Sequence, residues 1–132
     1  MRAAPRVVSP GVVALVPIAL AFLTACVPAE QLPSTCDDTS VNVSATVTSE
    51  RLDPATIDVC KGQQVTISVA SQADGELHFH GYDEEVPEQE IAAGQSITVK
   101  FTAVRSGQFP IELHPADGSE EVQLGTLFVH EH

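Results

Sequence analysis

The chain has 132 residues, of which 18 are acidic and only 6 are basic, so its formal net charge at pH 7 is −12. A surface this acidic repels phosphate backbones and anionic lipid headgroups, which excludes nucleic acid as a partner. It attracts cations, although solubility alone also accounts for such a charge.

Residues 1–25 are predicted to be an export signal. Arg2 and Arg6 give it a positive start, residues 12–23 form a short apolar run, and small residues precede Cys26. The run is well short of the roughly 20 apolar residues that cross a bilayer, so no transmembrane helix is expected. The ending resembles the bacterial lipobox, in which the cysteine is acylated and becomes the first mature residue. We therefore predict a protein anchored by lipid on the extracytoplasmic side of a bacterial membrane, with an unlipidated secreted form as the alternative.

Three cysteines occur in the chain. If Cys26 carries lipid, Cys36 and Cys60 remain as an even pair in an oxidising compartment, where a disulfide is expected. This bridge would close a loop of roughly 25 residues and stabilise the fold by about 3 kcal/mol. It would tie residues 26–40, a polar tether that contains proline, to the folded body. Two free thiols that act as metal ligands are the alternative.

From residue 41 onward, apolar and polar side chains alternate as they do on half-buried β-strands. Glycines separate the alternating segments, and no helical stripe of convincing length is present. The pattern predicts one all-β domain over residues 41–132, a sandwich of about seven short antiparallel strands. The alternating segments are residues 41–48, 65–69, 97–101, 109–113 and 124–129.

Residues 76–83 contain two histidines, His78 and His80, within a predicted strand. Side chains alternate along a strand, so the two imidazoles share one face with their Cα atoms roughly 6.6 Å apart. Two metal–nitrogen bonds of about 2 Å, together with two imidazole lengths, span that gap. With His114 they are candidate ligands of a metal site. A histidine pair that merely lies on the solvent face of a strand is the alternative.

Core packing restricts this interpretation. Leu77 and Phe79 alternate with the two histidines and are expected to face the core, which directs both imidazoles toward solvent. A twist or bulge at the strand end would turn one ring back. If only one of the pair faces His114, a carboxylate such as Asp83 or Glu112 is needed to complete the site.

Several short motifs occur in an order that is known from one family. They are residues 57–67 around Cys60, the histidine-rich strand, residues 93–94, residues 107–114 and residues 124–129. In their order and spacing the chain resembles a cupredoxin-like domain, which implies a Greek-key β-sandwich. Copper-carrying cupredoxins have a thiolate where this chain has Leu113, and Met1 is the only methionine. A blue, type 1 copper centre requires that thiolate, so it is not expected here.

The resemblance implies instead that His78, His80 and His114 converge at one end of the sandwich and bind copper or a similar divalent ion for trafficking, storage or delivery. Imidazole suits copper and zinc, and Cu(II) stands highest in the affinity order. Tyr82 and Asp83 are candidate partners that orient these ligands. A metal-free interaction module on the cell envelope is the alternative.

The remaining polar segments are not expected to form the centre of a functional site. Residues 83–90 form an acidic run that is predicted to be a solvated loop, whose carboxylates could supplement a site. His130 and His132 follow the last strand and are predicted to lie in a frayed terminus remote from His114. No nucleophile lies beside a suitable base and no glycine-rich phosphate loop occurs, so an enzyme is not expected.

Overall fold

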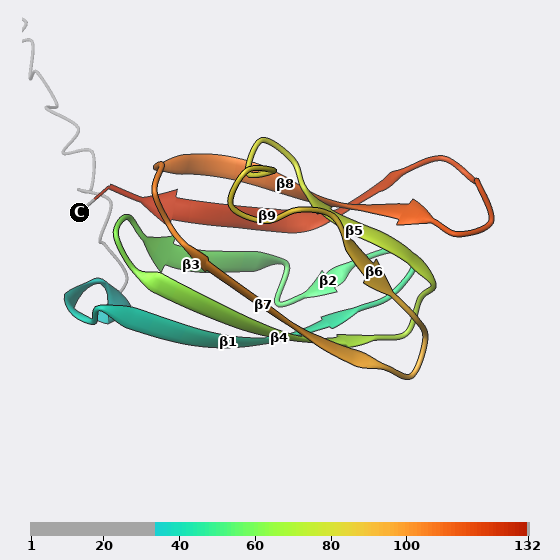
Figure 1. Ribbon diagram of the computed structural model, residues 1–132, viewed down its shortest axis with the longest axis horizontal. Helices are drawn as coiled ribbons and strands as arrows, with labels where there is room; N and C mark the ends of the chain where they lie inside the picture. The colour runs from blue at the N-terminus through green and yellow to red at the C-terminus, as the bar shows by residue number, and fades with distance from the viewer. Residues whose placement is uncertain (1–33, 132) are drawn as a thin grey trace, which may run out of the picture.

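The computed structural model describes residues 34–131, which form a sandwich of two β-sheets (Figure 1). The all-β prediction is confirmed, although the strand count exceeds the predicted seven or so. Two of the strands, β2 and β6, have only 2 and 3 residues. The elements are the 3-10 helix η1 (Ser34–Asp37) and the strands β1 (Ser40–Val47), β2 (Leu52–Asp53), β3 (Thr56–Cys60), β4 (Gln64–Ser71), β5 (Gly75–Phe79), β6 (Gln89–Ile91), β7 (Ser96–Thr102), β8 (Gly107–Pro115) and β9 (Val122–His130).

Some predictions fall on residues outside this description. The export signal over residues 1–25 and the lipidated Cys26 are among them, as is His132. Within residues 34–131, no helix combines the length and the apolar character that are needed to cross a membrane.

The two sheets face each other across the core. One has the strand order β2-β1-β4-β7 and the other the order β3-β9-β8-β5-β6. Two pairs, β1 with β4 and β3 with β9, are parallel, in addition to the antiparallel pairs that were expected. The antiparallel pairing of β5 with β8 matters most for function, because its register sets His78 opposite Glu112 and Glu76 opposite His114.

Inward side chains of both sheets build the core. Leu77 and Phe79 of β5 are buried, as the alternation predicts, and the ring of Phe79 lies 6.4 Å from that of Phe101 in the opposite sheet. Burying a side chain of this size contributes about 1.5–3 kcal/mol. The other large side chains that are fully buried include Tyr82, Ile57, Ile67, Ile111, Leu113 and Leu127.

The predicted disulfide between Cys36 and Cys60 is present, with the two Cα atoms 5.3 Å apart. It joins η1, which precedes β1 in one sheet, to the end of β3 in the other. Gln63 reinforces the junction: its amide donates to the Asp38 carbonyl at 2.8 Å, and its side-chain oxygen accepts the Cys60 N–H at 2.7 Å. The segment before β1 is therefore fixed to the sandwich.

His130 does not lie in a frayed terminus, so that prediction is wrong. It is the last residue of β9, it is buried, and it pairs with Cys60 in parallel register. Its Nε2 lies 2.8 Å from Asp58 Oδ1, and its ring centroid lies 3.9 Å from that of Phe128. The reason is that β9 continues beside β3 to its last residue, which the local sequence pattern did not reveal.

Candidate metal site

The three candidate histidines lie on the outward face of the five-stranded sheet. His78 is in β5, His80 follows that strand directly, and His114 is in β8. Because Leu77 and Phe79 face the core, the alternating imidazoles point away from it. The candidate site is therefore a cluster on the outward face of a sheet, as the alternation of Leu77 and Phe79 with the histidines predicts.

Glu112 lies between His78 and His80. Its Oε2 is 3.9 Å from Nδ1 of His78 and 3.5 Å from Nδ1 of His80. The side chains of His78 and Glu112 are only 13% and 15% exposed, whereas that of His80 is 64% exposed. Glu112 thus contacts two candidate ligands directly, in a partly desolvated setting where a carboxylate interacts strongly with a cation.

Asp83 binds His78 from the other side. Nε2 of His78 donates a close hydrogen bond to Oδ1 of Asp83, and this bond raises the pKa of His78 while burial opposes the rise. The same bond lowers the pKa of Asp83. In the neutral ring, a proton on Nε2 leaves a lone pair on Nδ1. That Nδ1 is buried and has no hydrogen-bond partner among the described residues.

Tyr82 fixes the loop that carries Asp83, and its hydroxyl is hydrogen-bonded to the backbone of Arg105 and not to a candidate ligand. It is fully buried, and its hydroxyl donates to the Arg105 carbonyl at 3.1 Å and accepts the Arg105 N–H at 3.0 Å. The Arg105 guanidinium lies over the Tyr82 ring and donates to the Gly81 carbonyl at 2.8 Å. The expectation that Tyr82 orients a ligand is thereby corrected. Gly81, with φ at 80°, ends the strand alternation and turns the next side chain inward.

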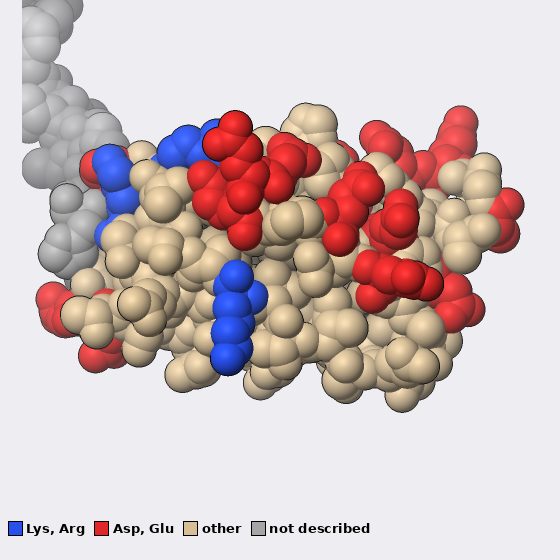
Figure 2. Space-filling model, viewed as in Figure 1, with Lys and Arg blue, Asp and Glu red and all other residues tan. Residues whose placement is uncertain are grey.

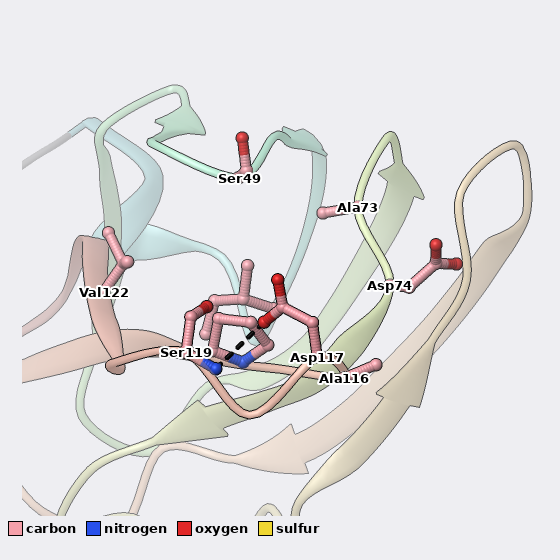
Figure 3. A pocket seen from close by; sticks show the side chains of 9 residues that line it. Ser49, Ala73, Asp74, Ala116, Asp117, Ser119 and Val122 are labelled. Carbon is pink, nitrogen blue, oxygen red and sulfur yellow. Dashed lines mark hydrogen bonds between the residues drawn. The ribbon is translucent and has the colours of Figure 1, made fainter.

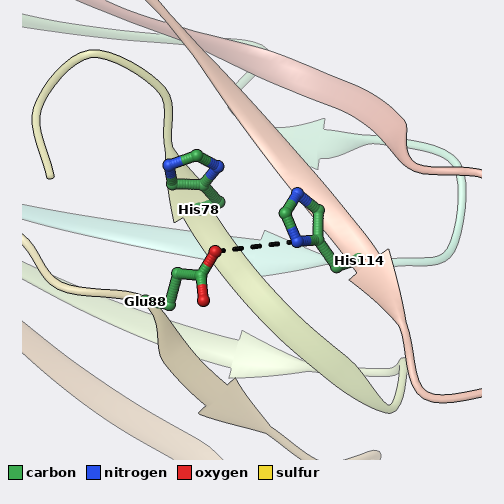
Figure 4. A group of neighbouring side chains, drawn as sticks. All are labelled: His78, Glu88 and His114. Atoms are coloured by element: carbon green, nitrogen blue, oxygen red, sulfur yellow. Dashed lines mark ion pairs between the residues drawn. The ribbon is translucent and has the colours of Figure 1, made fainter.

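His114 completes the cluster from β8. Its ring centroid is 5.3 Å from that of His78. Its Nδ1 lies 3.7 Å from Oε1 of Glu88, as Figure 4 shows, and its Nε2 lies 3.3 Å from Oε2 of Glu121. This Nε2 is buried and makes no hydrogen bond within the described part of the chain. Glu88 belongs to the acidic run of residues 83–90, whose carboxylates were expected as possible additions to a site, whereas no sequence pattern marks Glu121.

Three overlapping groups of ligand atoms are close enough to share an ion, because the atoms of each group lie within 4.8 Å of one another. Two atoms that bind one ion at about 2 Å are at most about 4 Å apart, so small side-chain rotations suffice. No group among residues 34–131 contains all three histidines, and His78 joins the other two. The groups are a first set (His78, His80, Glu112), a second set (His78, Glu88, His114) and a third set (Glu112, His114, Glu121).

Comparison with known proteins identifies the family. A sequence model of the cupredoxin-like domain matches residues 15–123, which is more than half of the chain. The chain belongs to the cupredoxin-like family. A similar solved structure is the metal-binding domain of the Streptococcus pneumoniae Cu(I)-exporting P-type ATPase CopA with Cu(I), at 16% identity and a TM-score of 0.54. The match covers 71% of this chain and 89% of that domain.

Other solved structures share the cupredoxin-like fold. A copper binding protein in the apo form has 14% identity and a TM-score of 0.55, over 70% of this chain and 90% of that one. The blue copper oxidase from Nitrosomonas europaea has 18% identity and a TM-score of 0.55, but the match covers only 39% of that longer protein. At these identities the likeness establishes the fold alone. No curated protein matches the chain in sequence.

The donor atoms of this cupredoxin-like domain differ from those of a blue copper centre. Leu113, at the position where the resemblance would place the thiolate, is buried in the core, and Cys36 and Cys60 are joined to each other. The cluster offers imidazole nitrogens and carboxylate oxygens, which suit Cu(II), Zn(II) and similar divalent ions, whereas Cu(I) prefers sulfur. The residues present, including the two buried ring nitrogens that make no hydrogen bond within residues 34–131, therefore fit a divalent ion.

A cavity of about 520 Å³ lies near the segment that follows β8 (Figure 3). Its polar groups include Asp117 and Ser119, and the carboxylate of Asp117 accepts the Ser119 N–H at 2.9 Å. None of the residues that line this cavity is a histidine or a cysteine. It therefore presents no serine beside an imidazole base, the arrangement that activates a hydroxyl nucleophile.

Proposed function

We propose that this chain is a lipid-anchored extracytoplasmic protein that binds Cu(II) or a similar divalent ion for metal trafficking, storage or delivery, and that it is not an enzyme. One observation carries the proposal. His78, His80 and His114 gather among carboxylates on one sheet face, and Nδ1 of His78 and Nε2 of His114 are buried and make no hydrogen bond within residues 34–131. An unpaired buried polar group costs about 1–3 kcal/mol, and a bound ion would remove that cost.

Copper is favoured among the divalent ions. Two structures with this fold, the metal-binding domain of CopA with Cu(I) and a copper binding protein, support this choice. The sulfur-free donor set then favours Cu(II) over Cu(I). Acidic side chains are also frequent in the part of the surface around β6 and β8 (Figure 2), and they would raise the local concentration of cations.

The disulfide supports a location outside the cytoplasm. Cys36 and Cys60 are paired, as is usual for proteins of oxidising compartments. Lipid on Cys26 would then attach the sandwich to the membrane through the tether of residues 26–40. Mass spectrometry of Cys26 in the protein isolated from membranes tests the anchor separately from metal binding.

Metal stoichiometry tests the function. Residues 27–132 contain every described strand and the disulfide, and we expect them to bind Cu(II) stoichiometrically without intense blue colour. His114→Ala keeps the first set complete and should weaken binding by less than about threefold, whereas the double variant His78→Ala/His114→Ala removes a ligand from each of the three sets and should no longer bind an ion stoichiometrically. The matched control is His130→Gln, which removes a histidine that contacts Asp58 outside the cluster and should bind as the wild type does. If neither the wild type nor His114→Ala binds an ion, the metal-free interaction module is the better account.

A further inference from the structure

The three ligand sets share their ligands in pairs. His78 belongs to the first and second sets, His114 to the second and third, and Glu112 to the first and third. An ion in any one set therefore keeps one ligand while it moves to a neighbouring set. We infer that the cluster is a relay, in which a single divalent ion is received at His80 and passes by stepwise ligand exchange to His114. This inference rests on the proposed function.

Side-chain exposure identifies the receiving end. The side chain of His80 is 64% exposed, compared with 33% for His114 and 13% for His78. A ligand must reach out of the surface to contact an ion that is still bound to its donor, and among the three histidines His80 does so best. At the other end, a groove of about 360 Å³ lined in part by Glu76, Glu90 and His114 gives an ion in the second set a route away.

The chemistry of the two histidine-rich sets suits exchange. The first and second sets each offer two imidazoles and one carboxylate, so an ion gains or loses little when it moves between them. Asp83 binds Nε2 of His78 and so fixes the shared ring while the other ligands change. With Nε2 engaged, His78 has one ring nitrogen left for a metal. The first and second sets therefore exclude simultaneous occupation.

Uptake kinetics separate a relay from a fixed site. Stopped-flow measurements follow the transfer of Cu(II) from its nitrilotriacetate complex to the protein, and competition titrations give the affinity. His80→Ala should slow uptake about tenfold or more while the affinity changes by less than about threefold, because the second set stays complete. Glu88→Gln should leave the initial uptake rate unchanged, and its affinity should also change by less than about threefold, because the first set stays complete. Glu120→Gln, which alters an exposed carboxylate outside all three sets, is the control for charge.

Failure of the relay and failure of metal binding itself would give different results in these measurements. Equal losses of rate and affinity in His80→Ala would indicate a fixed site built on His80 and would overturn the relay. Tight binding of a second ion to the wild type would overturn it as well, because the relay passes on a single ion. A wild-type protein that takes up no Cu(II) at all would overturn the proposed function itself.

Discussion

The two sheets of the sandwich are alike on their inward faces and different on their outward faces. Both contribute buried aliphatic and aromatic side chains to a single core. Outward, the four-stranded sheet has mostly neutral side chains, such as Ser44, Ser68 and Thr98, with Lys100 and Asp53 as charged residues, whereas the five-stranded sheet has histidines and several carboxylates. Core packing does not constrain the outward positions, so the side chains found there reflect the function of each surface.

Loss of a buried core side chain should destabilise the protein most. Phe79→Ala should lower the free energy of unfolding by about 3–5 kcal/mol, because it removes a fully buried ring from between the sheets. Ser68→Ala, on the outward face of the other sheet, should change it by less than about 0.5 kcal/mol. Urea denaturation measures both values. Similar values for the two variants would contradict the assignment of inward and outward faces.

Removal of the disulfide should have the next largest effect and should act on stability alone. Replacing Cys36 and Cys60 together with serine should cost about 3 kcal/mol in urea denaturation, because the bridge closes a long loop between the two sheets. The Cu(II) affinity of the folded variant should stay at the wild-type value. A parallel loss of affinity would indicate that the thiols, and not the histidines, take part in binding.

The outward face of the five-stranded sheet is tested by His78→Ala. Because His78 is shared by the first and second sets, its loss should lower the Cu(II) affinity by about 100-fold, or roughly 2.7 kcal/mol. Isothermal titration calorimetry measures this change, with His130→Gln as the histidine control. An unchanged affinity in His78→Ala would show that the cluster is not the binding site.

The inward and outward directions of side chains along a strand could be predicted from sequence, because they depend on local alternation. Leu77 and Phe79 were expected to face inward and His78 outward, and they do. The partners of His78 depend on the register of β5 with β8, which brings Glu112 opposite it from far along the chain. No local pattern fixes such a register, so the division of the ligands into three overlapping sets could not be predicted.

Two further residues show where alternation fails. Tyr82 was assigned to the site because it follows the histidines, but the turn at Gly81 redirects it into the core beneath Arg105. His130 was predicted to lie in a frayed terminus, but β9 pairs with β3 up to the Cys60–His130 pair, and His130 is buried there. In both cases tertiary contacts at the end of a strand, and not side-chain periodicity, decide the position.

The smallest expected effect concerns protonation of the metal-free protein. The hydrogen bond with Asp83 raises the pKa of His78 and lowers that of Asp83. The contribution of His78 to stability is complete below its ordinary pKa of 6.5 and is lost as the pH rises through the raised value. That of Asp83 is present above its ordinary pKa of 3.8 and is lost as the pH falls through the lowered value.

Asp83→Asn should therefore destabilise the metal-free protein most at about pH 5, where the pair is charged, and least at about pH 9. Denaturation at the two pH values measures the difference. Glu84→Gln alters a neighbouring exposed carboxylate and controls for net charge. Equal destabilisation by Asp83→Asn at both values would contradict the predicted ion pair.

Diffraction at the copper absorption edge, from crystals of residues 27–132 grown with Cu(II), tests most directly whether the outward histidines bind an ion. We predict an anomalous peak between β5 and β8, about 2 Å from a ring nitrogen of His78. Crystals with no peak there, or with copper only at remote positions such as His130, would contradict the account.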